Sequence, residues 1–202
     1  MSIKNVVFDV GNVIVRWSPK EIVELSFGKS TASDELSNTI FRNDIWKRLN
    51  KGLLSEDEAA SEYCQSLGWS QRECERFFYY VKATQLLIFG TVELINRIKR
   101  AGYKVYALTD NVHEIVSYLK ATYNFWPLFD GATVSAEVGL LKPDLDIYKS
   151  LLSQNNLEAS ETVFIDDMDY NVKGAESSGI FGIEFKNVDQ CAAELKKLGV
   201  KF

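Results

Sequence analysis

The sequence lacks any long hydrophobic run, and this absence excludes one class of protein at once. A membrane-spanning helix needs about 18 or more consecutive apolar residues, and no part of the 202-residue chain reaches that length. The apolar stretch near the N-terminus is interrupted by Asp9 and Asn12, and no small-residue cleavage site follows, which argues against a secretion signal. We therefore expect no membrane segment and a cytoplasmic location.

The sequence is also poor in cysteine and in excess positive charge. Its three cysteines are an odd number without a CxxC pair, which indicates free thiols in a reducing compartment. The 23 basic and 28 acidic residues give a net charge of −5, which disfavours nucleic acid as a partner. No GxGxxG follows the first expected strand, so a dinucleotide-binding domain is excluded. A small phosphorylated partner stays possible, because local cations and a metal can outweigh a small net charge.

What the sequence does contain is a regular alternation of strand and helix patterns. Short β-branched and aromatic runs predict strands at residues 3–8, 104–108, 131–135, 162–165 and 180–185. Between the later strands, helical spacing predicts helices at residues 92–101, 112–122, 144–152, 171–178 and 189–198. Alternating strands and helices are typical of an α/β fold, here a Rossmann-like parallel sheet with helices on both faces.

A long segment after the first strand has only helical patterns. Ser18-Pro19 opens a helix, and Ser55–Glu58 and Ser70–Glu73 match the capping box, in which a serine is followed three residues later by a glutamate. We therefore expect an α/β core domain formed by residues 1–17 and 83–202, with residues 18–82 inserted as an all-helical cap domain.

Four groups of polar residues lie at or beyond strand ends, where open parallel sheets bind ligands. Asp9 follows the first strand, Thr109-Asp110-Asn111 the second, Lys142 comes later in a glycine- and proline-flanked loop, and Asp166-Asp167 follow the fourth. Each has an ordinary alternative when taken alone: a solvated turn, a helix cap or a surface lysine. Two adjacent carboxylates, however, repel each other unless a cation is present, and Mg²⁺ prefers such oxygen ligands.

Taken together, the segments FDVGNV, LTDN, GLLKPDLDIY and FIDDMDYNVKGA resemble the haloacid dehalogenase-like hydrolase superfamily over nearly the full chain. The GNV form of the first segment and the DD form of the last look most like the α-glucose-1-phosphate phosphatase-like (sugar-phosphate phosphatase) subfamily. They are also similar to the N-terminal phosphatase domain of soluble epoxide hydrolases. The helical insert matches the cap position of that superfamily.

The resemblance implies a phosphatase with a covalent intermediate. Asp9 would attack phosphorus to form an aspartyl-phosphate, which water then hydrolyses. Thr109 would bind a phosphoryl oxygen together with the backbone N–H of Asp110 or Asn111. Lys142 would offset the negative charge on Asp9 and on the transferring group.

The resemblance also implies Mg²⁺ as the cofactor. Its ligands would be Asp9, the carbonyl oxygen of Gly11, and Asp167 with Asp166 beside it. Gly11 is a departure, since the family commonly has a second aspartate there as general acid/base, and glycine has no proton to donate. This favours substrates with a leaving group of low pKa, so a sugar 1-phosphate or an acyl phosphate is expected, with Asn12 or a cap residue as a partial substitute for the acid.

Other interpretations stay open at this stage. A non-catalytic phosphometabolite-binding or regulatory protein on the same fold is the alternative, and dehalogenase chemistry is disfavoured by the acidic pair. We expect a monomer or weak homodimer. Within the cap, Arg42, Trp46 and Lys47 are candidates to face the substrate, although such residues commonly form a helix's core and solvated faces. His113, the only histidine, lies near the mouth of the site and is more typical of a helix surface.

Overall fold

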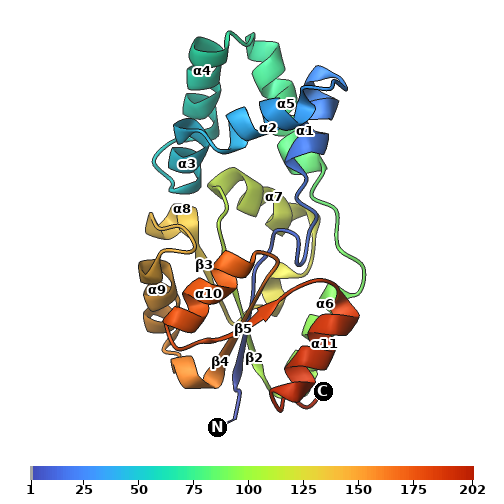
Figure 1. The fold of residues 1–202 in the computed structure, drawn as a ribbon, viewed down its shortest axis with the longest axis vertical. Coiled ribbons are helices and arrows are strands. Elements are labelled where there is room, and N and C mark those ends of the chain that lie inside the picture. The colour runs from blue at the N-terminus through green and yellow to red at the C-terminus, as the bar shows by residue number, and fades with distance from the viewer. Residues whose placement is uncertain (1) are drawn as a thin grey trace.

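A five-stranded parallel sheet forms the centre of the protein (Figure 1). The structure is a computed structural model and describes residues 2–202. The strand order is β3-β2-β1-β4-β5, and each neighbouring pair is parallel. The strands are β1 (Asn5–Phe8), β2 (Lys104–Thr109), β3 (Gly131–Val134), β4 (Thr162–Asp166) and β5 (Phe181–Glu184). The expected α/β fold with a Rossmann-like sheet is confirmed.

Helices cover both faces of this sheet. Those of the core are α6 (Thr91–Arg100), α7 (His113–Thr122), α8 (Ser135–Val138), α9 (Leu145–Asn155), α10 (Asp169–Ser177) and α11 (Val188–Lys197). Side chains alternate across a strand, so Val6 packs on one face in a cluster with α6 and α11, and Val7 packs on the other with α9 and α10. The central strand is therefore buried on both sides, as its uninterrupted apolar sequence predicts.

An all-helical cap is inserted between β1 and α6, in the upper part of Figure 1. Its helices are α1 (Pro19–Phe27), α2 (Ser33–Phe41), α3 (Asp44–Asn50), α4 (Glu56–Leu67) and α5 (Gln71–Ala83). Both predicted capping boxes are present, at the starts of α4 and α5. Cys64 and Cys74 lie between these two helices with their sulfur atoms 3.1 Å apart, and all three cysteines are free thiols as expected.

The two links between core and cap are hydrogen-bonded to each other. The backbone N–H of Arg16 donates to the carbonyl oxygen of Leu86 at 2.8 Å, and the N–H of Ile88 donates to that of Ile14 at 2.8 Å. Val15 and Leu87 form an antiparallel bridge between them. The chain therefore enters and leaves the cap through one short two-stranded ribbon, which we call the linker ribbon.

The cap also contacts the core through the short helix α8. The Ser135 hydroxyl donates to the carbonyl oxygen of Asn50 at 2.7 Å. Gly52, with φ of +67°, lies so close to Ala136 that a side-chain Cβ at this glycine would overlap the Ala136 carbonyl oxygen. The cap is thus closed onto the core on this side.

Local differences from the sequence-based expectation concern short elements. The sequence predicts Ser135 at the end of the third strand, but this residue begins α8. A four-residue helix shows no readable periodicity, so sequence patterns do not detect it. Among residues 2–202, no helix has the length and apolar character needed to cross a membrane.

Candidate active site

Three parallel strands bring polar residues to one edge of the sheet. Asp9 directly follows β1, Thr109 is the last residue of β2, and Asp166 is the last residue of β4. The strand register places Asp9 level with the ends of both neighbours. Its backbone N–H donates to the carbonyl oxygen of Ile165 at 2.9 Å. Asp9 therefore occupies the middle of the carboxyl edge, where open parallel sheets bind ligands.

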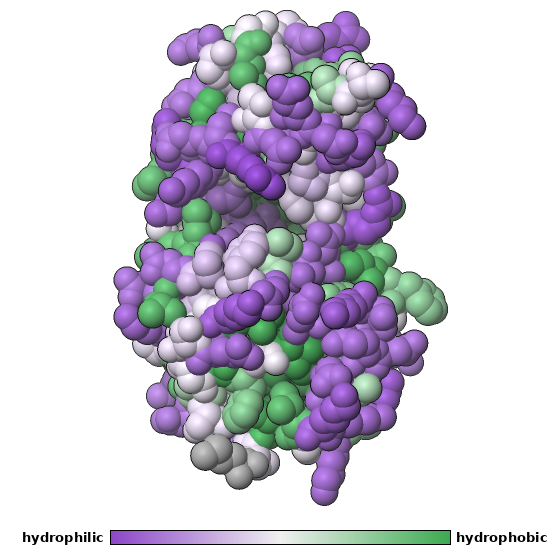
Figure 2. Space-filling view, viewed as in Figure 1, coloured by the Kyte–Doolittle hydropathy of each residue, from purple (hydrophilic) through white to green (hydrophobic). Residues whose placement is uncertain are grey.

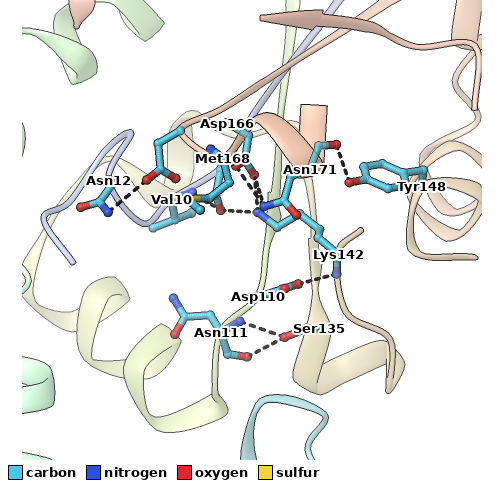
Figure 3. A network of polar contacts seen from close by, with 12 residues as sticks. Val10, Asn12, Asp110, Asn111, Ser135, Lys142, Tyr148, Asp166, Met168 and Asn171 are labelled. Atoms are coloured by element: carbon cyan, nitrogen blue, oxygen red, sulfur yellow. Dashed lines mark hydrogen bonds and ion pairs between the residues drawn. The ribbon is translucent and has the colours of Figure 1, made fainter. Parts of the chain in front are cut away.

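The ammonium group of Lys142 joins two of these carboxylates. Its Nζ lies 2.9 Å from Asp9 Oδ1 and 2.7 Å from Asp166 Oδ2, and only 2% of the lysine side chain is exposed. Lys142 reaches this edge from the loop between α8 and α9 and not from a strand end. Its backbone N–H donates to Asp110 Oδ1 at 3.1 Å, which attaches this loop to the one after β2 (Figure 3).

Asp166 is fully buried, and both its oxygens already have partners. Oδ1 accepts from the backbone N–H of Met168 at 2.8 Å, and the Asn171 side-chain amide donates to both oxygens at 3.0 and 3.1 Å (Figure 3). With Lys142 on Oδ2, this carboxylate mainly holds the lysine. Asn171 is a residue of the site that the sequence patterns do not predict. Its signal was the five-residue spacing from Asp166, which places Asn171 in the first turn of α10.

An acidic cluster suitable for a metal ion lies at the same edge. Asp9, Asp166 and Asp167 each offer an oxygen, and these atoms all lie within 4.8 Å of one another. Lys142 supplies one positive charge against the three carboxylates. The side-chain oxygen of Asn171 is buried and has no hydrogen-bond partner among residues 2–202. A group of hard oxygen atoms with excess negative charge fits a divalent cation such as Mg²⁺.

Burial and neighbouring charges displace the pKa values of Asp9, Asp167 and Lys142. Burial raises the pKa of the Asp9 carboxyl, the charge of Lys142 opposes this shift, and Asp166 adds to it. Burial also raises the pKa of Asp167, and its hydrogen bond from Asn12 opposes that. For Lys142, burial would lower the pKa, but the charges of Asp9 and Asp166 raise it above its ordinary value. The lysine is therefore charged, and the site favours an added cation.

The loop after Asp9 has space for a side chain that it does not carry. A Cβ placed on Gly11 would meet only Trp17 Cβ, at 3.8 Å, an ordinary van der Waals contact. Asn12, in the left-handed region with φ of +52°, donates its amide to Asp167 Oδ2 at 3.1 Å and accepts from the Trp17 backbone N–H at 2.8 Å. Asn12 thus positions Asp167, and an amide engaged in this way is no proton donor to a leaving group.

Thr109, at the end of β2, and the two residues that follow it differ in their exposure to the cavity. Thr109 is 1% exposed and is not among the residues that line the cavity, whereas Asp110 and Asn111 line it. The backbone N–H of Asn111 donates to the Ser135 hydroxyl at 2.9 Å (Figure 3). The backbone N–H of Asn111 is therefore not free to bind a phosphate. Of the two N–H groups expected as phosphate donors, the one of Asp110 is favoured.

A cavity of about 540 Å³ lies above these residues, between core and cap. This volume falls in the range of roughly 300–1,000 Å³ common for small-molecule sites. Figure 2 shows a hollow with hydrophilic residues between the two parts. The cap contributes Arg42, Trp46 and Lys47, the three residues expected as candidates to face a substrate. His113 is exposed and is not among the lining residues.

The fold and this site define a hydrolase of one known class. The model of the haloacid dehalogenase-like hydrolase family matches residues 3–179, and the chain therefore belongs to this family. The resemblance inferred from the four sequence segments is confirmed.

Phosphatases are among the similar proteins. The sesquiterpene phosphatase astK of Aspergillus oryzae is 27% identical over 96% of both chains. Bifunctional epoxide hydrolase 2 of Mus musculus is 36% identical over 37% of this chain and 14% of its own length. The family enzyme BT-2542 of Bacteroides thetaiotaomicron, solved with magnesium and inorganic phosphate, has a TM-score of 0.78 at 21% identity, covering 92% of this chain and 96% of that one. A phosphatase of this family, with an acidic cluster able to bind Mg²⁺, is the class that these findings support.

Proposed function

We propose that the protein is a Mg²⁺-dependent phosphomonoester hydrolase that acts on a small phosphorylated metabolite through an aspartyl-phosphate at Asp9. The observation that carries the proposal is the position of the Lys142 ammonium, 2.9 Å from Asp9 and 2.7 Å from Asp166 at the base of the cavity. The charge of Lys142 opposes the burial that raises the pKa of Asp9 to about 7, so Asp9 is partly ionised at neutral pH, and an ionised carboxylate is the nucleophile that the reaction needs.

In the first step, an Asp9 oxygen attacks phosphorus and the bond from phosphorus to the ester oxygen breaks. In the second, water attacks the aspartyl-phosphate, releases inorganic phosphate and regenerates the carboxylate. Lys142 offsets negative charge on the phosphoryl oxygens in both steps, while the Thr109 hydroxyl and the backbone N–H of Asp110 orient them. Positioning and charge stabilisation supply most of the acceleration in phosphoryl transfer.

Asp9, Asp167 and the carbonyl oxygen of Gly11 would hold Mg²⁺, with Asp166 behind them fixing Lys142. The bound ion would supply positive charge next to the phosphoryl oxygens. Asn12 keeps the Asp167 carboxylate in place by its 3.1 Å hydrogen bond.

The leaving group is inferred from Gly11, which carries no acid to protonate it. An alkoxide of high pKa leaves poorly without a proton donor, and general acid help is typically worth about 10²–10⁴ in rate. A sugar 1-phosphate or an acyl phosphate has a leaving group of lower pKa, so its hydrolysis loses less rate when no acid is present. A sugar phosphate of this kind is therefore the proposed substrate.

Residues 18–82 are proposed as the cap domain that closes over this site, with residues 1–17 and 83–202 as the catalytic core. The last cap helix, α5, extends one residue past this boundary, to Ala83. Closure over the cavity would exclude water and bring α3 against the substrate.

The test is phosphate release from acetyl phosphate and p-nitrophenyl phosphate with Mg²⁺, followed by a panel of phosphorylated metabolites. We expect turnover that EDTA abolishes, that Asp9→Asn abolishes, and that Asp189→Asn, an exposed carboxylate on α11, leaves unchanged. Acid quenching during turnover should trap phosphate on Asp9, detectable as a mass increase in that peptide.

The alternatives predict different results. Binding of phosphorylated metabolites without hydrolysis of any would support the non-catalytic interpretation. Halide release from a 2-haloacid would support a dehalogenase, which the acidic pair disfavours because it would repel the substrate carboxylate. Best activity on simple primary-alcohol phosphates would contradict the proposed leaving-group preference.

A further inference from the structure

Two cations on the cap side of the cavity have no carboxylate partner. Arg42 follows α2 and Lys47 lies on α3, both line the cavity, and both are exposed. Among residues 2–202, neither forms an ion pair. The neighbouring Arg48, which does not line the cavity, behaves differently: it pairs with Asp44 at 3.3 Å and with Glu62 at 3.0 Å. Arg42 and Lys47 are thus cations without an acidic partner that line the cavity.

The cavity has opposite charge at its two ends. At the core end, the lining carboxylates are Asp9, Asp110 and Asp167, with Lys142 among them. At the cap end, the described residues that line it from α1 to α3 include no acidic side chain. One anionic group of a ligand has its place at Lys142 and the metal site. The cap end therefore offers charge for a second anionic group.

A cluster of aromatic side chains lines the cavity beside these two cations. Trp17 and Trp46 stack with ring centres 5.8 Å apart, and Phe41 meets Trp46 edge-on at 4.8 Å. All three line the cavity beside Arg42 and Lys47. Rings fixed by their mutual packing present a rigid apolar surface, against which the apolar face of a ligand ring can pack.

We propose that Arg42 and Lys47 form a subsite for a second anionic group, a phosphate or a carboxylate, on the leaving-group part of the substrate. The ring that carries this group packs against Trp17 and Trp46. This inference rests on the proposed function and refines its substrate class to sugar 1-phosphates with an anionic group at the opposite end of the ring. Arginine recognises either oxyanion through paired hydrogen bonds, and lysine adds a point charge.

Three matched substrates test the subsite: a hexose 1-phosphate, the hexose 1,6-bisphosphate and the hexuronic acid 1-phosphate. We expect kcat/KM to be at least about tenfold higher for one or both two-anion substrates than for the first. The double variant Arg42→Gln/Lys47→Gln should remove this advantage by raising KM for the two-anion substrates much more than KM for the hexose 1-phosphate. Lys29→Gln, an exposed cap cation outside the cavity lining, is the control.

The order of the two-anion substrates identifies the group bound, because the bisphosphate and the uronic acid differ only there. Equal kcat/KM for all three substrates, or an advantage that survives the double variant, would overturn the inference while leaving the phosphatase proposal intact. Absence of turnover with every substrate would instead overturn the phosphatase proposal. In that case calorimetric binding of hexose 1,6-bisphosphate to the unsubstituted protein, compared with the double variant, still decides whether the subsite exists.

Discussion

At the scale of single residues, the site depends on one buried ammonium group. Lys142 contacts Asp9 and Asp166 and is almost fully enclosed. A buried charge of this kind is stabilising only while its partners remain. The same residue is therefore expected to contribute to both catalysis and stability, and the two contributions can be measured separately.

Lys142→Met should destabilise the metal-free protein by roughly 3 kcal/mol at neutral pH, since it leaves two buried carboxylates without a cation. The folded-state pKa of Asp9, already raised by burial, then lies further above its unfolded value, so the variant is penalised less at pH 5, where Asp9 can be protonated, and more as pH rises. Urea unfolding in EDTA at pH 5 and pH 8 measures this difference. A loss of stability independent of pH would contradict the explanation by charge.

Gly11→Asp tests whether the missing general acid determines the leaving-group preference. A Cβ fits at this position. We expect kcat for a primary-alcohol phosphate to rise by about 10²-fold, with little change for acetyl phosphate. Gly11→Asn has nearly the same shape without an ionisable proton and is the control. An equal gain in both variants would show that the effect comes from shape and not from acid catalysis.

At the scale of elements, the contact between the loop after α3 and helix α8 sets how closely the cap approaches the core. Ser135 donates to the Asn50 carbonyl oxygen and accepts from the Asn111 backbone N–H. One hydroxyl thus connects the cap to the loop after β2. We therefore expect closure of the cap to be coupled through α8 to the geometry of the loop after β2.

Gly52→Ala should hold the cap away from the core, because the added methyl group would overlap the Ala136 carbonyl oxygen. We expect a higher KM for metabolite substrates and faster limited proteolysis. Gly68→Ala is the matched control: its φ of +70° gives similar backbone strain, but nothing lies within 4 Å of the added Cβ. If both variants changed KM equally, backbone strain and not contact with the core would be the cause.

At the scale of the whole molecule, Mg²⁺ should stabilise the folded chain by mass action. At a concentration ten times its dissociation constant, a ligand specific for the folded state adds about 1.4 kcal/mol, which for a chain of this size raises Tm by roughly 3–5 °C. Scanning calorimetry with Mg²⁺ and with EDTA checks this. Asp167→Asn should abolish the shift and Asp189→Asn should retain it; a shift that survives Asp167→Asn would place the ion elsewhere.

Sequence patterns predict the sheet and its main helices well, because they depend on local periodicity. The strand that precedes Asp9 and the capping boxes at Ser55 and Ser70 can each be predicted from a few consecutive residues. The contacts that define the site cannot, since they join distant segments. No local pattern around Lys142 indicates that its ammonium lies between Asp9 and Asp166; the family resemblance alone predicts its place near Asp9.

The same limit explains the features that sequence reasoning missed. Asn171 is an unremarkable helix residue until the fold places its amide against Asp166. The engagement of the Asn111 N–H by Ser135 follows from the packing of α8 against the loop after β2, which no local signal encodes. Sequence motifs therefore identify which residues react, and the tertiary structure identifies which residues hold them in place.

The linker ribbon has a consequence for how a substrate enters and leaves. Both connections between core and cap run through these two hydrogen-bonded strands, so we expect the cap to move relative to the core by bending at this ribbon. In such a motion Arg42 and Lys47 would move with the cap, and Lys142 would stay with the core. Opening of the cap would therefore separate the Arg42 and Lys47 subsite from the Lys142 site, and a ligand that spans both would lose one set of contacts as the cap opens.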